Sequence, residues 1–203
     1  MPLTQSPFSA KLPAPPRKPK NLDVRGREYL LSDEVEAMMR AASKVGRHGQ
    51  RDKALILLTY RHGFRVSEIN SLRWHQIDLK QGQIHVHRRK NGKPSVHPLL
   101  GDEIRLLRKL KRDYPDTSYV FESERKTPLS ERVIHQMVAR AGEIAELDFP
   151  VHPHMLRHGC GYYLASKGTE TRTIQDYLGH KQIQHTVKYT ELAPGRFEGL
   201  WGI

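Results

Sequence analysis

Apolar residues recur at helical spacing over most of the chain. Ser32 is followed by acidic residues and is a candidate N-cap for a helix that ends near Gly46. The apolar face of this helix is formed by Val35, Met38, Met39 and Ala42. A second helix is apolar enough between residues 55 and 60 to lie at the centre of the core, and Gly63 marks its end.

The apolar period changes near the middle of the chain. Residues 64–74 carry a helical stripe in which Arg65 and Glu68 lie one turn apart. Residues 83–98 instead alternate around an Asn-Gly pair, which predicts a small antiparallel hairpin. The helical period then returns over residues 102–113, 129–142, 154–167, 171–178 and 183–191. The expected fold class is mostly α-helical, with a small antiparallel β-hairpin or sheet.

The composition indicates an anionic partner. The 203 residues include 34 Lys and Arg against 22 Asp and Glu, a formal net charge of +12, and this excess favours nucleic acid. No apolar run is long enough to span a membrane and no signal peptide opens the chain, so we expect a cytoplasmic protein without membrane contact. The single cysteine, Cys160, excludes an internal disulfide and a thiolate metal cluster.

The first twenty residues differ from the rest of the chain. They hold six prolines and four basic residues, and they lack an apolar period. This composition is typical of a disordered basic arm. We place the arm at residues 1–27, ahead of one main domain over residues 28–203.

The stretch HPHMLRHGCG places three histidines, His152, His154 and His158, at the start of a predicted helix. The His-x-His pair is compatible with zinc, but such a site needs further ligands and the nearest carboxylate is Asp148. Packing is the ordinary role of a histidine. His154 and Arg157 are spaced i, i+3 at the positive end of the helix, so both can also face an anion such as phosphate.

Four motifs in this order resemble the tyrosine recombinase (phage integrase) superfamily: HGFRVSEI, HPHMLRHGCG, QDYLGHKQIQHTVKYT and GRFEGLW. They are most similar to the small recombinases that invert the promoter switch of fimbrial operons. The resemblance covers about residues 28–203 and implies the tyrosine recombinase catalytic-domain fold. It also implies a reaction without metal or cofactor, in which a tyrosine attacks the scissile phosphate and leaves a 3′-phosphotyrosyl link and a free 5′-hydroxyl.

The resemblance assigns this reaction to particular residues. Arg65 and Arg157 match the two family arginines, whose planar guanidiniums can clamp the non-bridging phosphate oxygens. His154 would donate to the phosphate or help to manage the tyrosine proton, and His180 would hydrogen-bond a phosphate oxygen. Tyr189, nine residues beyond His180, is the expected nucleophile.

The hairpin turn is expected to supply the general acid. Lys90 matches the family lysine that protonates the departing 5′-oxygen. Counting forward from Arg65 leads instead to Arg89, but a lysine loses its proton more readily than an arginine. Arg88, Arg89 and Lys93 surround Lys90 and are expected to contact DNA.

Other residues near these motifs have supporting roles. Glu68 is expected to orient its surroundings, although by itself the pattern also fits an ordinary ion pair with Arg65. Tyr177 is the rival nucleophile, but it falls on an apolar stripe, so packing is its expected role. His152 and His158 are expected to be structural.

Larger integrases carry a core-binding domain before the catalytic domain, and the residues ahead of Arg65 leave no room for one. The resemblance implies that the partner is double-stranded DNA with short inverted-repeat sites. It also implies a homotetramer on two DNA sites, DNA-bending accessory proteins and a nucleoid-associated location. Residues 192–203 are expected to pack into a neighbouring protomer; folding back on their own domain is the alternative.

The expected function is site-specific recombination that inverts a regulatory DNA segment, with phase variation of transcription as its outcome. Excision or integration of a mobile element is the alternative within the same class. A DNA-binding regulator that no longer cleaves, and a topoisomerase-like enzyme that religates one duplex, are alternatives from other classes.

Overall fold

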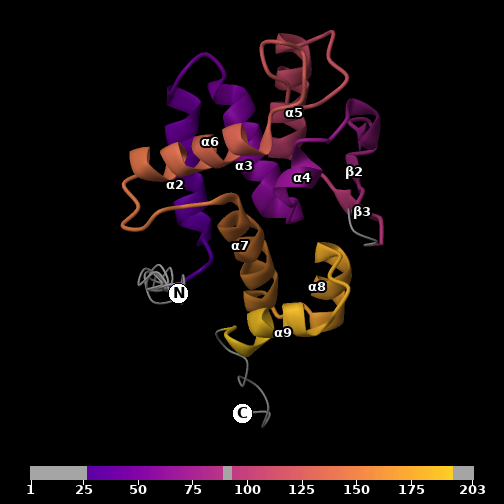
Figure 1. The fold of residues 1–203 in the computed structure, drawn as a ribbon. Coiled ribbons are helices and arrows are strands. Elements are labelled where there is room, and N and C mark those ends of the chain that lie inside the picture. Colours follow the sequence, from indigo (N-terminus) through magenta and orange to yellow (C-terminus); the bar gives the residue numbers. More distant parts are fainter. Residues whose placement is uncertain (1–26, 89–92, 194–203) are drawn as a thin grey trace, which may run out of the picture.

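The computed structural model describes residues 27–88 and 93–193, which form helices and one small sheet (Figure 1). The helices are α2 (Ser32–Lys44), α3 (Gly49–His62), α4 (Val66–Ile69), α5 (Gly101–Asp113), α6 (Glu131–Ile144), α7 (Pro153–Ser166), α8 (Thr171–Leu178) and α9 (Gln184–Glu191). The strands are β1 (Ile77–Asp78), β2 (Gln83–Val86) and β3 (Ser95–Pro98), and the short 3-10 helix Trp74–Gln76 precedes β1. The predicted fold class, mostly helical with a small antiparallel sheet, is confirmed.

Helix α3 is the centre of the main core. It packs against α2, α5 and α7, while α6 packs against α2. Leu55, Ile56 and Leu58 of α3 are at most 1% exposed, as the apolar run predicts for a central helix. Gly63 ends α3 in the left-handed conformation, with φ 58°, which glycine adopts without a Cβ clash.

A second, smaller apolar cluster lies where α7, α8 and α9 meet. In Figure 1, α8 and α9 lie beside one end of α7, away from α2 and α6. The buried members of this cluster are Cys160, Ala165, Ile174, Leu178 and Tyr189. The C-terminal helices are therefore held to the domain mainly through α7.

The segment 64–74 forms the single helical turn α4 and not the longer helix that its apolar stripe predicts. The chain leaves the helix because Arg73 pairs with Tyr119 in an isolated β-bridge, and because the Val120 N–H donates to the Leu72 carbonyl at 2.9 Å. The predicted hairpin is confirmed: β2 pairs with β3 in antiparallel register, and β1 adds a third strand on the other side of β2.

The sequence predicts Ser32 as the N-cap of α2, but Ser32 is instead the first residue of this helix. Leu31 occupies the cap position, where its N–H donates to Glu34 Oε2 at 2.8 Å. The Ser32 hydroxyl is instead engaged with the Tyr60 hydroxyl at 3.0 Å. The acceptor that the helix start requires thus comes from a glutamate side chain in its first turn.

The predicted arm at residues 1–27 and the predicted tail at residues 192–203 lie almost wholly outside the described residues. Arg27 is described: it pairs with Glu34 and lies over the Phe149 ring at 5.1 Å, so this residue belongs with the domain. The division into arm, domain and tail otherwise stays a prediction. Among residues 27–88 and 93–193, no helix combines the length and apolarity that crossing a membrane would take.

Candidate active site

Arg65 and Glu68 form one unit at the start of α4. The backbone N–H of Arg65 donates to Glu68 Oε2 at 3.0 Å, and its Nη1 donates to Glu68 Oε1 at 2.7 Å. Burial would raise the pKa of Glu68, but these hydrogen bonds and the nearby charge of Arg88 lower it overall. The carboxylate is therefore ionised and fully buried, and it orients Arg65, whose side chain stays 27% exposed.

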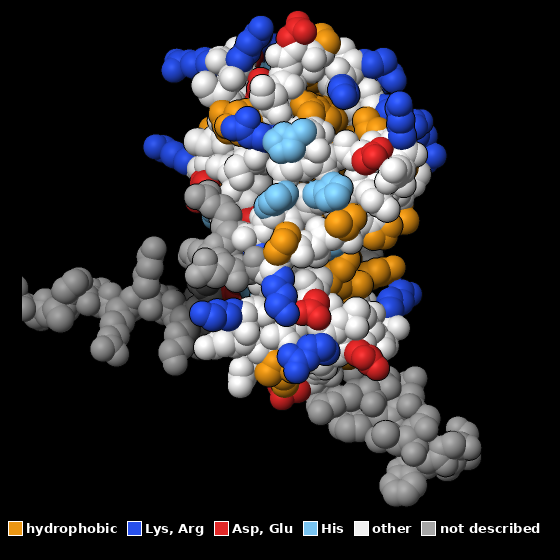
Figure 2. Space-filling view, turned by 90° about the vertical axis from the view of Figure 1, so that its right-hand side faces the viewer, with side chains coloured by type: hydrophobic (Ala, Val, Ile, Leu, Met, Phe, Trp, Pro, Cys, Tyr) orange, Lys and Arg blue, Asp and Glu red, His pale blue; other side chains and the backbone are white. Residues whose placement is uncertain are grey.

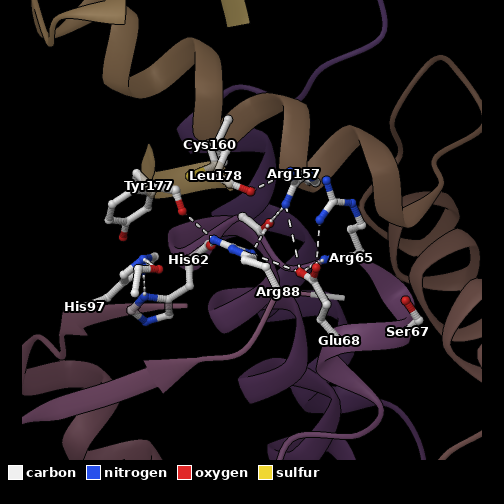
Figure 3. Close-up of polar contacts among 12 residues, drawn as sticks. His62, Arg65, Ser67, Glu68, Arg88, His97, Arg157, Cys160, Tyr177 and Leu178 are labelled. Carbon is white, nitrogen blue, oxygen red and sulfur yellow. Dashed lines mark hydrogen bonds and ion pairs between the residues drawn. The ribbon is translucent and has the colours of Figure 1, made fainter. Parts of the chain in front are cut away.

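Arg157 reaches the same carboxylate from α7 (Figure 3). Its Nη2 donates to the Leu178 carbonyl at 2.8 Å, its Nη1 donates to the Gly63 carbonyl, and Nη1 lies 4.0 Å from Glu68 Oε2. Burial, followed by the charges of the neighbouring arginines, lowers the pKa of Arg157 to about 9. Arg157 is thus still protonated at neutral pH, although its side chain is only 4% exposed.

Arg88 belongs to the same cluster and corrects a prediction. We expected Arg88 to contact DNA, but its side chain is 0% exposed. Its Nη1 donates to Glu68 Oε2 at 3.0 Å, and its Nη2 donates to the His62 carbonyl at 2.9 Å. A guanidinium enclosed in this way does not reach a phosphate on the surface. Lys93 is exposed, while Arg89 and Lys90 lie outside the described residues, so the roles predicted for these three stay predictions.

This cluster carries an excess of positive charge. The guanidiniums of Arg65, Arg88 and Arg157 surround the one carboxylate of Glu68. Three guanidiniums around one carboxylate leave a net positive charge in a largely buried site, which favours binding of an anion. Guanidiniums also match the geometry of phosphate oxygens. Lys, Arg and His side chains are also spread over the face on the side of β2, β3 and α8 (Figure 2). The cluster is therefore suited to a phosphate of a larger polyanion.

Two predicted histidines lie close to these arginines. His154 is exposed in the first turn of α7. His180 follows the left-handed Gly179 that ends α8, and its Nδ1 is hydrogen-bonded to Thr186 Oγ1 at 2.9 Å. Burial, then the charge of Arg157, lowers the pKa of His180 to about 3. Its imidazole is therefore neutral at physiological pH and can donate one hydrogen bond without adding charge.

Tyr189 lies on α9, inside the smaller apolar cluster, and is 0% exposed. Its hydroxyl is hydrogen-bonded to Nδ1 of His158 at 2.7 Å. Its ring centroid lies 6.1 Å from that of His180 and 5.1 Å from that of Tyr162. Burial raises the pKa of Tyr189, although the charge of Arg157 opposes this. The hydroxyl is thus protonated, and its reaction requires both access to a phosphate and a proton acceptor.

His158 makes a contact that the sequence reasoning missed. We expected it to be structural, yet it is the partner of the Tyr189 hydroxyl. Burial, then the charge of Lys188, lowers the pKa of His158 to about 3, which leaves the imidazole neutral and able to accept a hydrogen bond. Its spacing from His154, four residues along α7, was the available signal, because such residues share a helix face.

The other singled-out residues lie around this site. His152 pairs with Glu28 at 3.2 Å. The ring of Tyr177 stacks on His97 with centroids 3.8 Å apart, and its hydroxyl donates to the Arg61 carbonyl at 2.9 Å. Tyr177 is therefore engaged in packing. Within the described part of the chain, no three His, Cys, Asp or Glu side chains are grouped so that they could hold a metal ion.

The structure brings Arg65 and Arg157 together around Glu68, with His154, His180 and the helix-borne Tyr189, which is the set of residues expected of a tyrosine recombinase. The sequence matches the Phage integrase family over residues 28–196. Type 1 fimbriae regulatory protein FimB of Escherichia coli (strain K12) is 44% identical over 184 residues, covering 88% of this chain and 92% of FimB. Regulatory protein FimE of the same strain is 45% identical over 181 residues, covering 86% of this chain and 91% of FimE.

Solved structures agree with this assignment. XerA recombinase superposes with a TM-score of 0.73 at 26% identity, covering 93% of this chain and 66% of that one. A lambda integrase tetramer bound to a Holliday junction superposes with a TM-score of 0.64 at 23% identity, covering 79% of this chain and 47% of that one, which shows a shared fold. The chain belongs to the phage integrase family, and the predicted family and enzyme class, a tyrosine-type site-specific recombinase, are confirmed.

Proposed function

We propose that the chain cleaves and rejoins DNA at specific sites through a 3′-phosphotyrosyl intermediate and thereby inverts a regulatory DNA segment. The observation that carries this proposal is the cluster of three guanidiniums around Glu68, placed beside a buried tyrosine whose hydroxyl already has an imidazole partner. A binding protein has no need of such a tyrosine. The similarity to FimB and FimE supports inversion in preference to excision or integration of a mobile element.

In the proposed cleavage step, Arg65 and Arg157 hold the non-bridging oxygens of the scissile phosphate, and His154 and His180 donate hydrogen bonds to it. The Tyr189 oxygen forms a bond to phosphorus, and the bond from phosphorus to the 5′-oxygen breaks. The proton of Tyr189 passes to Nδ1 of His158, placed at 2.7 Å, because the negative charge of the bound phosphate raises the pKa of this imidazole above its value of about 3 in the free protein. The 5′-oxygen takes up a proton, which we assign to Lys90, and the reverse attack by a 5′-hydroxyl of the partner strand rejoins the DNA.

Covalent trapping tests the reaction. Wild-type protein is incubated with fragmented DNA of the source organism and denatured with SDS, and the DNA that stays attached is sequenced. We expect attachment at a few loci for the wild type and none for Tyr189→Phe, because the phenyl ring has no nucleophilic oxygen. Tyr177→Phe, which removes the hydroxyl of another largely buried tyrosine in the same region, is the matched control and should keep attachment.

The outcomes separate the classes of function. Native DNA binding without attachment for any variant would favour the DNA-binding regulator. Relaxation of supercoiled DNA without exchange between sites would favour a topoisomerase-like enzyme. Attachment at loci followed by inversion of the segment between inverted repeats supports recombination, with a change in transcription of the neighbouring genes as its cellular outcome.

We further propose that the active form is a homotetramer on two DNA sites, assisted by DNA-bending proteins in the cytoplasm near the nucleoid. The shared fold with a lambda integrase that forms a tetramer on a Holliday junction supports this assembly. Residues 195–203 include Phe197, Leu200 and Trp201, apolar side chains suited to a neighbouring protomer. Deleting these residues should abolish pairing of two DNA sites while single-site binding remains; unchanged strand exchange would show that the segment folds back on its own domain.

A further inference from the structure

Arg88 occupies a position that its expected surface role does not explain. It follows β2, and its side chain is fully buried among three other segments (Figure 3). The guanidinium donates to the carbonyls of His62 and Gly63, at 2.9 and 3.1 Å, and also to the carbonyl of Tyr177. Its remaining acceptor is Glu68 Oε2, at 3.0 Å. One side chain therefore connects the end of α3, the acidic residue of α4 and the end of α8.

The acceptors of Arg88 explain why a buried arginine is tolerated there. The last carbonyls of a helix have no partner within the helix and carry partial negative charge. The C-terminal ends of α3 and α8 both point at the two buried arginines. Arg88 donates to the carbonyls of His62 and Tyr177, and Arg157 donates to the carbonyl of Leu178. These dipoles, together with Glu68, offset the cost of removing two guanidiniums from water.

Gly179 provides the space for this contact. It ends α8 with φ 64°, and a Cβ added there would lie 2.6 Å from Cγ of Arg88. The residue after it is His180, so the position of His180 depends on the same turn that the aliphatic part of Arg88 packs against. Arg88 is thus in contact with the segments that carry Arg65 and His180.

Arg88 also competes with Arg157 for two acceptors. Both guanidiniums donate to the Gly63 carbonyl. Arg88 Nη1 lies 3.0 Å from Glu68 Oε2, whereas Arg157 Nη1 lies 4.0 Å from the same oxygen. Without Arg88, Glu68 Oε2 would keep the Arg65 N–H but lose the guanidinium that lies nearest to it, so Arg157 would be drawn closer than its present 4.0 Å.

We propose that Arg88 is a positioning residue for the phosphate site: by occupying Glu68 Oε2 and the ends of α3 and α8, it keeps Arg157 from moving closer to Glu68 than 4.0 Å and holds it ready for the scissile phosphate. This inference depends on the proposed function, since the phosphate is that of the cleaved DNA. Arg88 itself does not touch the phosphate. Its effect is on the alignment of Arg65, Arg157 and His180.

The test measures single-turnover cleavage at saturating protein, using a nicked DNA site recovered by the covalent trapping described above. Arg88→Gln should slow cleavage by about 10²-fold, comparable to the loss of one stabilising donor, with little change in DNA affinity. The distinguishing variant is Arg88→Gln combined with Glu68→Gln. It removes the negative charge that would capture Arg157, while the amide oxygen of the glutamine can still accept a hydrogen bond from Arg65, so cleavage should recover by about tenfold relative to Arg88→Gln alone.

Arg51→Gln is the matched control. Arg51 is another largely buried arginine, 8% exposed, whose Nη1 donates to the Glu122 carbonyl at 2.9 Å and whose Nη2 donates to Asp52 Oδ1 at 2.9 Å. Its loss should lower the melting temperature but change cleavage by the folded protein less than about threefold. If Arg88→Gln does not fold, Arg88→Lys keeps the charge with fewer donors and should cleave about tenfold more slowly than the wild type.

The outcomes distinguish this inference from the proposed function. If the wild type fails to cleave any DNA, the proposed function falls, and this inference with it. If the wild type cleaves and the Arg88 variants cleave equally fast, only the positioning role is overturned. The same holds if the double variant is slower than Arg88→Gln, because a purely structural role predicts that the two losses add.

Discussion

At the scale of single residues, the site differs most from expectation at His158 and Arg88. Both are polar residues next to predicted catalytic positions. His158, which we expected to be structural, contacts the Tyr189 hydroxyl, and Arg88, which we expected to contact DNA, is buried. Residue type and spacing could not distinguish these cases. Each depends on which segment packs against the side chain.

His158→Ala should slow formation of the covalent DNA complex by about 10²-fold or more, because the Tyr189 hydroxyl loses the imidazole placed to accept its proton. DNA affinity should stay within about twofold, since the phosphate ligands remain. The measurement is single-turnover cleavage alongside equilibrium binding. His48→Ala is the matched control, because it removes a similar hydrogen bond, from His48 Nδ1 to the Tyr114 hydroxyl at 2.6 Å. Equal cleavage rates for the two variants would contradict the role of His158.

At the scale of elements, α7 organises the site. Its first turns carry His154 and Arg157, and two glycines in its interior allow close contacts on either side. A Cβ on Gly159 would lie 2.6 Å from the Leu30 carbonyl oxygen, and a Cβ on Gly161 would lie 2.6 Å from the Tyr189 ring. Glycine inside a helix lowers helix stability by about 1 kcal/mol relative to alanine. The close packing that these two glycines allow offsets this loss.

Gly161→Ala should lower the free energy of unfolding by about 1–2 kcal/mol, although alanine favours the helix, because the added methyl overpacks against Tyr189. Covalent complex formation should fall as well, since the ring must shift away from His158. Gly101→Ala is the control: its added Cβ would meet only Arg105 Nη1, at 3.5 Å, so stability should be unchanged or slightly raised. Thermal denaturation of both variants measures the difference. A Gly161→Ala protein more stable than the wild type would show that α9 adapts without strain.

At the scale of the whole molecule, the main core around α3 and the smaller cluster of α7, α8 and α9 meet at a site rich in buried polar groups. Its imidazoles include His158 and His180, and His97 lies nearby, with Nδ1 3.2 Å from Nδ1 of His62. Burial lowers the pKa of all three, His97, His158 and His180, to about 3. The folded protein therefore holds these side chains neutral where the unfolded chain would protonate them.

Stability should fall as the pH drops below about 6.5, the ordinary histidine pKa, and continue to fall towards pH 3. The sign follows because the unfolded state binds more protons over this interval. Between pH 7.5 and pH 5.5 each imidazole should lower the free energy of unfolding by about 1.4 kcal/mol, which makes roughly 4 kcal/mol for the three. The measurement is the free energy of unfolding against pH. His97→Gln should reduce the pH dependence by about one third; an unchanged dependence would mean that His97 is not held neutral by the fold.

The sequence by itself determined most of the helices, the hairpin and the family, because apolar periodicity, turn chemistry and motif spacing are local properties of the chain. It also led to Tyr189 in preference to Tyr177, whose ring packs on His97. The length of α4 was not predictable, because the chain leaves that helix to pair Arg73 with Tyr119, 46 residues away.

Only the tertiary structure decided which charged groups are buried and which stay exposed. Arg88 is enclosed by carbonyls that lie 26 and 89 residues away in the chain, so no local pattern around it could reveal its burial. The hydrogen bond of His158 with Tyr189 likewise joins residues 31 positions apart. Burial and pairing of polar groups are set by contacts between distant segments, and in this protein those contacts bring motif residues together into a charged site beside the buried Tyr189.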